Sequence, residues 1–420
     1  MSEPSYVSTR GGGAPVPFFE ALLAGLAPDG GLYVPTAVPA LPDDWRRAST
    51  LPELGARVLA PWLSGVDDLD ALLEDALSFP IPLVPLGGAW EGVHVLELFH
   101  GPTLSFKDVG ARTMARLMAR ARDETRITVL AATSGDTGSA VASGFEGVRG
   151  VRVVLLYPKG QVSEVQERQL IVERPGVRTL AVEGTFDDCQ RLVKAAFAEG
   201  APGARLSSAN SINVGRLLPQ MLYYAWAIRQ LGARPTVVVP SGNLGNLTAG
   251  TLAMRAGLPI AGFLAAHNAN DGFPRFLDGE ASPAGDSVRT LSNAMDVGVP
   301  SNLERLRSMF TDDALRSLVR GESVTDEATL DTMRAVYEET GAVVDPHTAV
   351  GLEAARRARR RGAPGPFVVL ATAAPAKFPE AVKRATGIEP EMPARLAALW
   401  EQPVAVETIP PDLGALQVWL

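Results

Sequence analysis

Short apolar runs alternate with longer helical patterns along most of the chain beyond about residue 88. Four of the runs are rich in Val, Leu and Ala, at residues 128–132, 151–157, 236–239 and 367–371. Apolar runs of this length are typical of strands that are buried on both faces of a parallel sheet. The alternation of such strands with helices predicts an α/β protein with a largely parallel sheet.

The first eighty residues follow a different pattern. Residues 18–26 predict a short apolar helix that ends in the turn sequence Pro-Asp-Gly-Gly, and residues 51–77 have helical patterns. Residues 79–88 are dense in Pro and Gly, which is typical of a boundary. A length of 420 residues suggests two or three domains at about 150 residues each. We therefore expect a small N-terminal domain over 1–80 and a catalytic domain over 81–420, in which residues 302–361 are mostly helical.

Two glycine-rich loops follow predicted strands and open predicted helices. Residues 133–139 read Thr-Ser-Gly-Asp-Thr-Gly-Ser, and residues 240–250 contain Gly-Asn-Leu-Gly-Asn. The first N–H groups of a helix lack internal partners, so they attract anions, and glycine lets the backbone approach a ligand closely. Either loop alone is more typical of a tight turn with a Ser or Asp N-cap. Two of them in one chain favour a ligand with more than one anionic group.

Composition and charge restrict the classes of function. The chain has 39 Lys and Arg against 47 Asp and Glu, a net charge of −8, which argues against a nucleic-acid partner. It leaves room for a small anionic substrate in a locally basic pocket. Cys189 is the only cysteine, so neither an internal disulfide nor a cysteine metal cluster is expected. We see no signal peptide and no apolar run of about 18 residues, so we expect a cytoplasmic protein without a membrane segment.

Several familiar enzyme motifs do not occur. The chain has neither the P-loop nor the dinucleotide-binding glycine pattern, and it lacks the G-x-S-x-G elbow and the H-E-x-x-H zinc motif. Its four histidines lie far apart in the sequence, so each is better interpreted as structural. Hydrolase and zinc-enzyme hypotheses therefore have little support, and we expect no metal.

The stretch from Glu97 to Met118, ELFHGPTLSFKDVGARTMARLM, carries the most specific signal. It predicts a Gly-Pro turn followed by a helix that opens at residues 105–108. Lys107 would lie in the first turn, where the helix dipole disfavours a cation, and Phe106 and Val109 would partly desolvate it. Such a lysine can supply the neutral amine that Schiff-base chemistry needs. The residues alone nevertheless favour a surface lysine that extends its amine into water.

This stretch resembles the cofactor-lysine motif of the threonine synthases, which are pyridoxal 5′-phosphate (PLP) enzymes. The resemblance extends in order over nearly the whole chain, and its short N-terminal unit is similar to the bacterial and fungal form. The further matching segments are FFEALLAGLAPDGGLYVP, ATSGDTGSA, LYPKGQVSEVQERQL, SSANSINVGRLLPQ, VPSGNLGNLTAG, LSNAMDVGVPSN, DPHTAVG and ATAAPAKFPE.

The resemblance implies a fold and an activity. The fold is PLP fold type II, similar to the tryptophan synthase β chain, with two α/β lobes built on parallel sheets. The smaller lobe would cover about residues 125–225, with the remainder of 81–420 in the larger lobe. The activity would be that of a PLP-dependent carbon–oxygen lyase that acts on a phosphate ester. It would convert O-phospho-L-homoserine and water to L-threonine and phosphate, the last step of threonine biosynthesis.

The resemblance also implies which residues hold the cofactor. Lys107 would carry PLP and act as the mobile acid and base. Asp136 would contact the 3′-oxygen of the ring, and Thr372 would face the pyridine nitrogen. The loop that would cradle the cofactor phosphate consists of Gly242, Asn243, Leu244, Gly245 and Asn246.

Two further segments would bind the substrate. Ser134, Gly135 and Thr137 resemble the loop that binds the amino-acid carboxylate. In residues 210–216, Asn210, Ser211 and Arg216 resemble the site of the leaving phosphate, and the planar guanidinium of Arg216 suits that ligand.

The sequence departs from the family at two of these positions. The family strand motif usually reads T-A-H-P-A-K-F, whereas Ala374 replaces its histidine here, and Asn246 replaces a frequent Asp. One alternative is a related PLP phospholyase or dehydratase that releases 2-oxobutyrate, and another is a non-catalytic ligand sensor on an enzyme scaffold. We expect a monomer or a homodimer.

Overall fold

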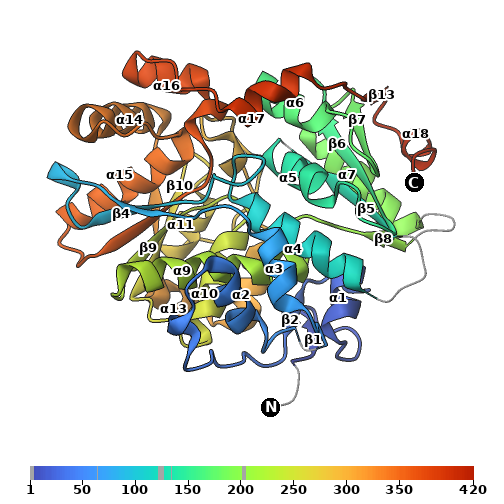
Figure 1. Ribbon diagram of the computed structural model, residues 1–420, viewed down its shortest axis with the longest axis horizontal. Helices are drawn as coiled ribbons and strands as arrows, with labels where there is room; N and C mark the ends of the chain where they lie inside the picture. Colours follow the sequence, from blue (N-terminus) through green and yellow to red (C-terminus); the bar gives the residue numbers. More distant parts are fainter. Residues whose placement is uncertain (1–3, 64, 122–126, 134, 201–204) are drawn as a thin grey trace.

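Two large sheets organise the chain, each enclosed by helices, and a third sheet of two antiparallel strands lies in the N-terminal segment (Figure 1). The computed structural model describes residues 4–63, 65–121, 127–133, 135–200 and 205–420. The smaller sheet lies at the upper right of Figure 1 and the larger one at the left, with the N-terminal segment below them. The expected two-lobed α/β fold with parallel sheets and a small N-terminal unit is confirmed.

The smaller sheet has five strands in the order β13-β7-β6-β5-β8, and all its neighbours are parallel. Along β5 the side chains of Val129 and Ala131 face one apolar cluster, whereas Leu130 and Ala132 face another. Because helices cover both faces, β5 is buried at every residue. The strands are β5 (Ile127–Ala132), β6 (Val151–Pro158), β7 (Val177–Val182), β8 (Arg205–Ser207) and β13 (Glu407–Ile409), and the helices are α5 (Asp136–Phe145), α6 (Glu164–Ile171) and α7 (Phe186–Glu199).

The larger sheet has six strands in the order β11-β10-β9-β12-β4-β3, and only β3 runs antiparallel to its neighbour among the described strands. Val237 and Val239 face the same cluster as α9 and α10, and Val238 faces the cluster around α14 and α15. The strands are β3 (Leu83–Pro85), β4 (Val93–Glu97), β9 (Thr236–Pro240), β10 (Gly262–His267), β11 (Val319–Ser323) and β12 (Phe367–Ala371). The helices around them are α9 (Met221–Leu231), α10 (Gly245–Arg255), α11 (Gly272–Leu277), α13 (Asp312–Leu318), α14 (Asp326–Thr340), α15 (Pro346–Arg360) and α16 (Pro379–Thr386).

The remaining elements form the N-terminal unit, the connection between the sheets and the C-terminal tail. The N-terminal unit contains β1 (Tyr6–Ser8), β2 (Tyr33–Pro35), α1 (Phe18–Ala24), α2 (Leu51–Leu59) and α3 (Leu69–Ala76). The connection and tail contain α4 (Lys107–Arg120), α8 (Val214–Leu217), the 3₁₀ turn η3 (Leu218–Gln220), α12 (Asn302–Met309), the 3₁₀ turn η5 (Pro375–Lys377), α17 (Ala394–Ala397) and α18 (Leu413–Gln417).

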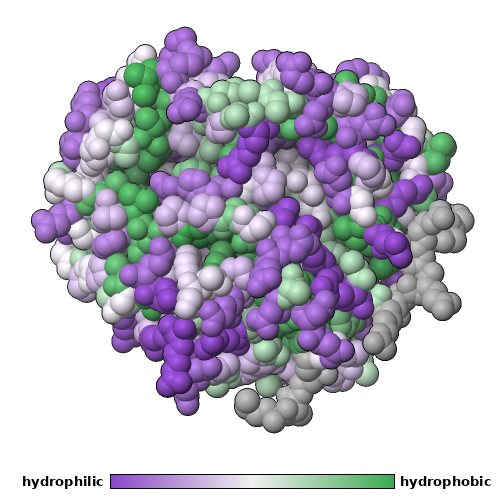
Figure 2. Space-filling model, in the orientation of Figure 1, coloured by the Kyte–Doolittle hydropathy of each residue, from purple (hydrophilic) through white to green (hydrophobic). Residues whose placement is uncertain are grey.

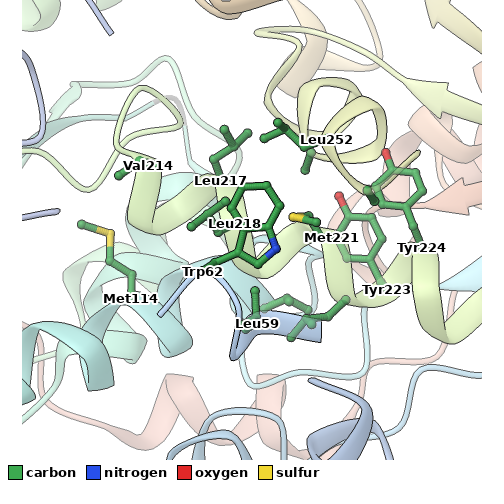
Figure 3. Close-up of a cluster of buried hydrophobic side chains, with 14 of the residues drawn as sticks. Leu59, Trp62, Met114, Val214, Leu217, Leu218, Met221, Tyr223, Tyr224 and Leu252 are labelled. Carbon is green, nitrogen blue, oxygen red and sulfur yellow. The ribbon is translucent and has the colours of Figure 1, made fainter. Parts of the chain in front are cut away.

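A buried apolar cluster joins the N-terminal unit to the helices between the lobes (Figure 3). Trp62, just after α2, is fully buried and points between Leu217 and Leu218 on one side and Met221 on the other. Met114 of α4 belongs to the same cluster. The N-terminal unit therefore shares its core with the helices that carry the candidate site.

On the face shown in Figure 2, hydrophilic side chains dominate and hydrophobic ones form smaller patches between them. No helix among the described residues is both long and apolar enough to cross a membrane.

The predicted strands agree closely with the observed ones. Phe367–Ala371 forms β12 as expected, and the other three strands begin or end one residue beyond the predicted range. The helix predicted over 18–26 ends earlier, at Ala24, because Gly25 takes a positive φ of 74° and closes it.

Two strands, β11 and β13, lie in parts of the chain where the sequence did not predict them. The mostly helical segment 302–361 contains a strand, β11, which pairs with β10 at the edge of the larger sheet. Strand β13 returns to the smaller sheet and pairs with β7, although the sequence placed the residues after about 225 in the larger lobe. The exact domain limits remain a prediction.

Trp62→Ala should destabilise the fold strongly, because the lost side chain leaves a cavity that the packed helices cannot close. We expect a loss of about 3–5 kcal/mol in the free energy of unfolding, measured by urea denaturation. The control is Trp400→Ala, because Trp400 is 39% exposed, and it should cost less than about 1 kcal/mol. Equal losses in both variants would contradict the shared core.

Candidate functional site

The loops that the sequence singles out gather at the carboxyl ends of strands from both sheets. The loop after β5 leads to Asp136, the loop after β9 leads to Gly245, and Thr372 directly follows β12. Lys107 follows β4 after a loop that pairs with Ala373 through Ser105. Ligands of α/β proteins bind at this end of a parallel sheet, because the backbone there turns away and leaves polar groups free.

Lys107 begins α4, as predicted, and its side chain is largely buried, with 14% exposed. Its Nζ lies 3.8 Å from Oδ2 of Asp136. Burial lowers the pKa of Lys107 to about 8, and the positive charges of Lys377 and Arg216 act in the same direction, against the raising effect of Asp136. A substantial fraction of the amine is therefore neutral, and nucleophilic, near pH 8.

Asp136 opens α5 and is almost completely buried. Its Oδ1 accepts hydrogen bonds from Nζ of Lys377 at 2.6 Å and from Nε2 of Gln166 at 3.1 Å. Burial by itself would raise the pKa of Asp136, but the charges of Lys377 and Lys107 together hold it well below its usual range. Asp136 is thus a carboxylate with one oxygen occupied and the other facing Lys107.

The second glycine-rich loop has a backbone shape that suits a close ligand. Leu244 takes a φ of 59° and is fully buried, which is a strained conformation for a leucine. A Cβ on Gly242 would lie 3.0 Å from the carbonyl oxygen of Ala294, and one on Gly245 would lie 3.1 Å from Cβ of Ser211. The loop ends at the N-terminus of α10, an 11-residue helix whose first N–H groups favour an anion.

This loop contacts the segment 210–216. Nδ2 of Asn243 donates a hydrogen bond to Oγ of Ser211 at 2.8 Å. Nδ2 of Asn302 donates to the carbonyl oxygen of Asn243 at 3.0 Å, which holds the loop from α12. Nδ2 of Asn246 instead donates to the carbonyl oxygen of Pro240, so its side chain fixes the strand end. The structure thus brings together the two segments that were expected to bind phosphate groups.

Arg216 is buried in α8 and its charge has little compensation. Its Nη1 donates to the carbonyl oxygen of Ala209 at 2.6 Å. Among the described residues, Nε of Arg216 and Oδ1 of Asn210 are buried without a hydrogen-bond partner. Burial lowers the pKa of Arg216, but a guanidinium remains charged at neutral pH. A buried cation with an unused donor is suited to an anionic ligand.

The remaining predicted residues are placed as follows. Thr372 is buried, and its carbonyl oxygen accepts a hydrogen bond from N–H of Phe106, next to Lys107. Gly135 has a φ of 131°, and a Cβ there would lie 2.7 Å from Cδ of Gln166. Thr137 is half-buried in the first turn of α5. Ser134 lies outside the described residues.

Three polar residues of the site were not predicted. Lys377 and Gln166 both lie within segments that matched the family, and a lysine within Ala-Ala-Pro-Ala-Lys-Phe-Pro was a signal of burial. Arg305 of α12 gave no such signal. It is fully buried, and its hydrogen bonds go to the carbonyl oxygens of Tyr33, Ser211 and Ile212 and to Oδ1 of Asn302.

Ala374, where the family usually has histidine, lies in a small apolar cluster with Leu104, Val165 and Leu396. The nearest part of the C-terminal tail therefore packs against this position through apolar side chains.

These groups fit a cofactor that carries an aldehyde and a phosphate. Lys107 supplies a buried amine with a lowered pKa, and the loop at the start of α10 supplies backbone donors in a space that glycine keeps open. Buried Thr372 follows β12, which lies between β9 and β4 in the larger sheet, and buried Asp136 approaches Lys107 from the smaller sheet.

Arg305→Met should destabilise the fold, because it leaves several buried acceptors without their donor. We expect a loss of about 2–4 kcal/mol in the free energy of unfolding, measured with urea. The control is Arg307→Met on the same helix, where the side chain is 45% exposed and pairs with Asp312, and the change should stay below about 1 kcal/mol. A loss in Arg305→Met no larger than in Arg307→Met would contradict this role.

Three family models together match nearly the whole chain. A model of pyridoxal-phosphate dependent enzymes matches residues 79–373, one of the threonine synthase N terminus matches 5–77, and one of the threonine synthase C-terminal region matches 348–419.

Curated proteins and solved structures agree with these matches. The chain is 41% identical over 418 residues to the threonine synthase of Serratia marcescens, covering 96% of each protein. A crystal structure of PLP-bound threonine synthase from Brucella melitensis superimposes with a TM-score of 0.91 at 37% identity, covering 99% of this chain and 98% of that one. The threonine synthase structure from Escherichia coli gives 0.90 at 38% identity, covering 99% of each chain. The chain therefore belongs to the threonine synthase family of PLP-dependent lyases.

Proposed function

We propose that this protein converts O-phospho-L-homoserine and water to L-threonine and phosphate, with its site residues in the roles set out below. The observation that carries the proposal is the proximity of the buried amine of Lys107 to the buried guanidinium of Arg216, whose Nε has no hydrogen-bond partner among the described residues. An amino-acid substrate that bears a phosphate needs both features within one site.

PLP, when bound, supplies the electron sink that makes the carbon atoms next to the amino group acidic. Lys107 would hold the cofactor and then carry protons at the substrate carbons, which its lowered pKa favours near neutral pH. Asp136 would present Oδ2 to the cofactor ring, and Thr372 would present its hydroxyl to the ring nitrogen. The backbone N–H groups of Gly242–Asn246 would hold the cofactor phosphate.

A second group of residues would hold the substrate. Arg216, Asn210 and Ser211 would bind the substrate phosphate and stabilise the charge that develops as phosphate leaves. Ser134, Gly135 and Thr137 would bind the amino-acid carboxylate. The link between Asn243 and Ser211 supports this division, because it fixes the cofactor loop against the phosphate segment at 2.8 Å.

Some broader features also belong to this proposal. We propose a catalytic domain over 81–420 that follows an N-terminal domain over 1–80, and a monomer or homodimer that works in the cytoplasm without a nucleic-acid partner. Arg305 supports a direct contact between the two domains, because it donates hydrogen bonds to the carbonyl oxygens of Tyr33 in β2 and of Ile212 within residues 210–216.

The first test is a product assay with O-phospho-L-homoserine, combined with a visible absorption spectrum. The wild type should release phosphate and threonine in equal amounts and show the absorption of bound PLP. Lys107→Ala should lose both, because no other group would hold the cofactor covalently. Lys194→Ala, which changes an exposed lysine on α7, should keep both. Release of 2-oxobutyrate in place of threonine would contradict the proposal.

The second test is Arg216→Lys. Lysine keeps the charge but cannot offer the bidentate geometry of a guanidinium, so kcat/KM should fall about 10- to 100-fold. Inhibition by inorganic phosphate should weaken as well. Arg178→Lys, at an exposed position of β7, is the control and should change neither quantity. Unchanged phosphate inhibition in Arg216→Lys would remove Arg216 from the phosphate site.

A further inference from the structure

Lys377 is a fully buried lysine to which the proposed reaction assigns no role. It lies in the 3₁₀ turn η5, directly beyond Thr372 and β12. Its Nζ donates to Oδ1 of Asp136 at 2.6 Å and to the carbonyl oxygen of Thr103 at 3.0 Å. Burying a charged amine costs free energy unless the amine is paired, so these two contacts are what make the position of Lys377 possible.

The two oxygens of Asp136 have different partners. Oδ1 accepts hydrogen bonds from Lys377 and Gln166, which lie on elements of opposite lobes. Oδ2 faces Lys107 at 3.8 Å, a distance too long for a hydrogen bond. Lys377 thus forms the tight ion pair with Asp136, and Lys107 forms the loose one.

We propose that Lys377 is a positioning residue that keeps Asp136 ionised and oriented while the charge on Lys107 changes. This inference rests on the proposed function, in which the amine of Lys107 joins the cofactor and carries protons. Lys107 is then no constant partner for a buried carboxylate. Lys377 takes part in neither step, so its contact with Asp136 need not change during the reaction.

The other charged groups around Asp136 cannot replace Lys377. His347 on α15 is the next titratable group that acts on Asp136, but its Nδ1 is paired with Asp345 at 2.7 Å. Arg216 on α8 acts on Lys107 and lacks a tight contact with Asp136 among the described ion pairs. Asp108 on α4 accepts hydrogen bonds from Thr103, and burial raises its pKa, so it cannot supply the positive charge that Asp136 needs.

The decisive test uses the full chain without cofactor, in a Lys107→Ala background that mimics the loss of the mobile charge. Stability is measured by urea unfolding between pH 5 and 8. With Lys377 present, the pKa of Asp136 in the folded state lies below its unfolded value of about 3.9, so this group adds no pH dependence in that range.

Adding Lys377→Met should reverse the sign of this linkage. The buried carboxylate loses its tight partner, so its folded pKa should rise above the unfolded value. Other buried groups, such as His267 with a pKa lowered to about 4, give the Lys107→Ala background a pH profile of its own, which serves as the reference. Relative to that reference, the folding equilibrium constant should decrease as pH increases, by up to about tenfold per unit until the raised pKa is reached. Adding Asp136→Asn as well should restore the reference profile, and Lys377→Arg should keep it.

A control variant and a charge-free variant distinguish loss of the ion pair from a general loss of stability. Lys383→Met removes a lysine whose exposed pair with Glu389 has the same charges, and it should not change the pH profile. If Lys377→Met does not fold, the variant that also carries Asp136→Asn should fold, because it removes both charges. Failure of both to fold, or a profile in Lys377→Met equal to that of the Lys107→Ala background, would overturn the inference and make Lys377 a packing residue.

A second readout uses the cofactor-loaded protein. In Lys377→Met the visible absorption of bound PLP should gain a transition as pH decreases, and this transition should be absent when Asp136→Asn is added. An unchanged spectrum would also count against the inference. The outcomes separate the two proposals, because the cofactor-free profiles do not depend on threonine formation, and a profile unchanged by Lys377→Met leaves the product assay intact.

Discussion

Burial of both sheets on both faces is the constraint on which the site depends. The strands carry apolar side chains toward helices on each side, as Val237, Val238 and Val239 do in alternation. The polar groups of the candidate site then gather where strands end, and parallel strands end together at one edge of each sheet. Lys107, Asp136 and Thr372 come from three different strand ends for this reason.

Burying several charged side chains in one place costs free energy unless each charge has a partner. Asp136 and Arg216 differ in how their charges are compensated. Asp136 is compensated within the protein, by Lys377 closely and by Lys107 at a longer distance. Arg216 keeps a buried donor without a partner among the described residues, which is consistent with the anion-binding role proposed for it. The protein as a whole carries a charge of −8, and the local excess of cations therefore reflects the site rather than the composition.

The sequence was informative where a structural feature is encoded locally. The strand at residues 367–371 could be predicted because its apolar run is continuous, and the start of α4 at Lys107 because a Gly-Pro turn precedes it. Strand β11 was missed because it lies at a sheet edge, where one exposed or half-buried residue after another breaks the apolar run. Lys377 and Arg305 were missed because their partners are distant in sequence, and only folding brings these partners to them.

Arg305 extends the same argument to the N-terminal unit. A fully buried guanidinium that binds carbonyl oxygens of Tyr33 and Ile212 ties β2 to the segment that leads into Arg216. The apolar contacts of Trp62 with the helices around α8 act at the same boundary. The hydrogen bonds of the Arg305 guanidinium depend on direction, whereas apolar packing sets only the spacing between the elements. Together they fix both the distance and the orientation of residues 210–216 relative to the N-terminal unit. The N-terminal unit is therefore part of the framework that holds residues 210–216, the proposed phosphate site, and its core is continuous with that of the lobes.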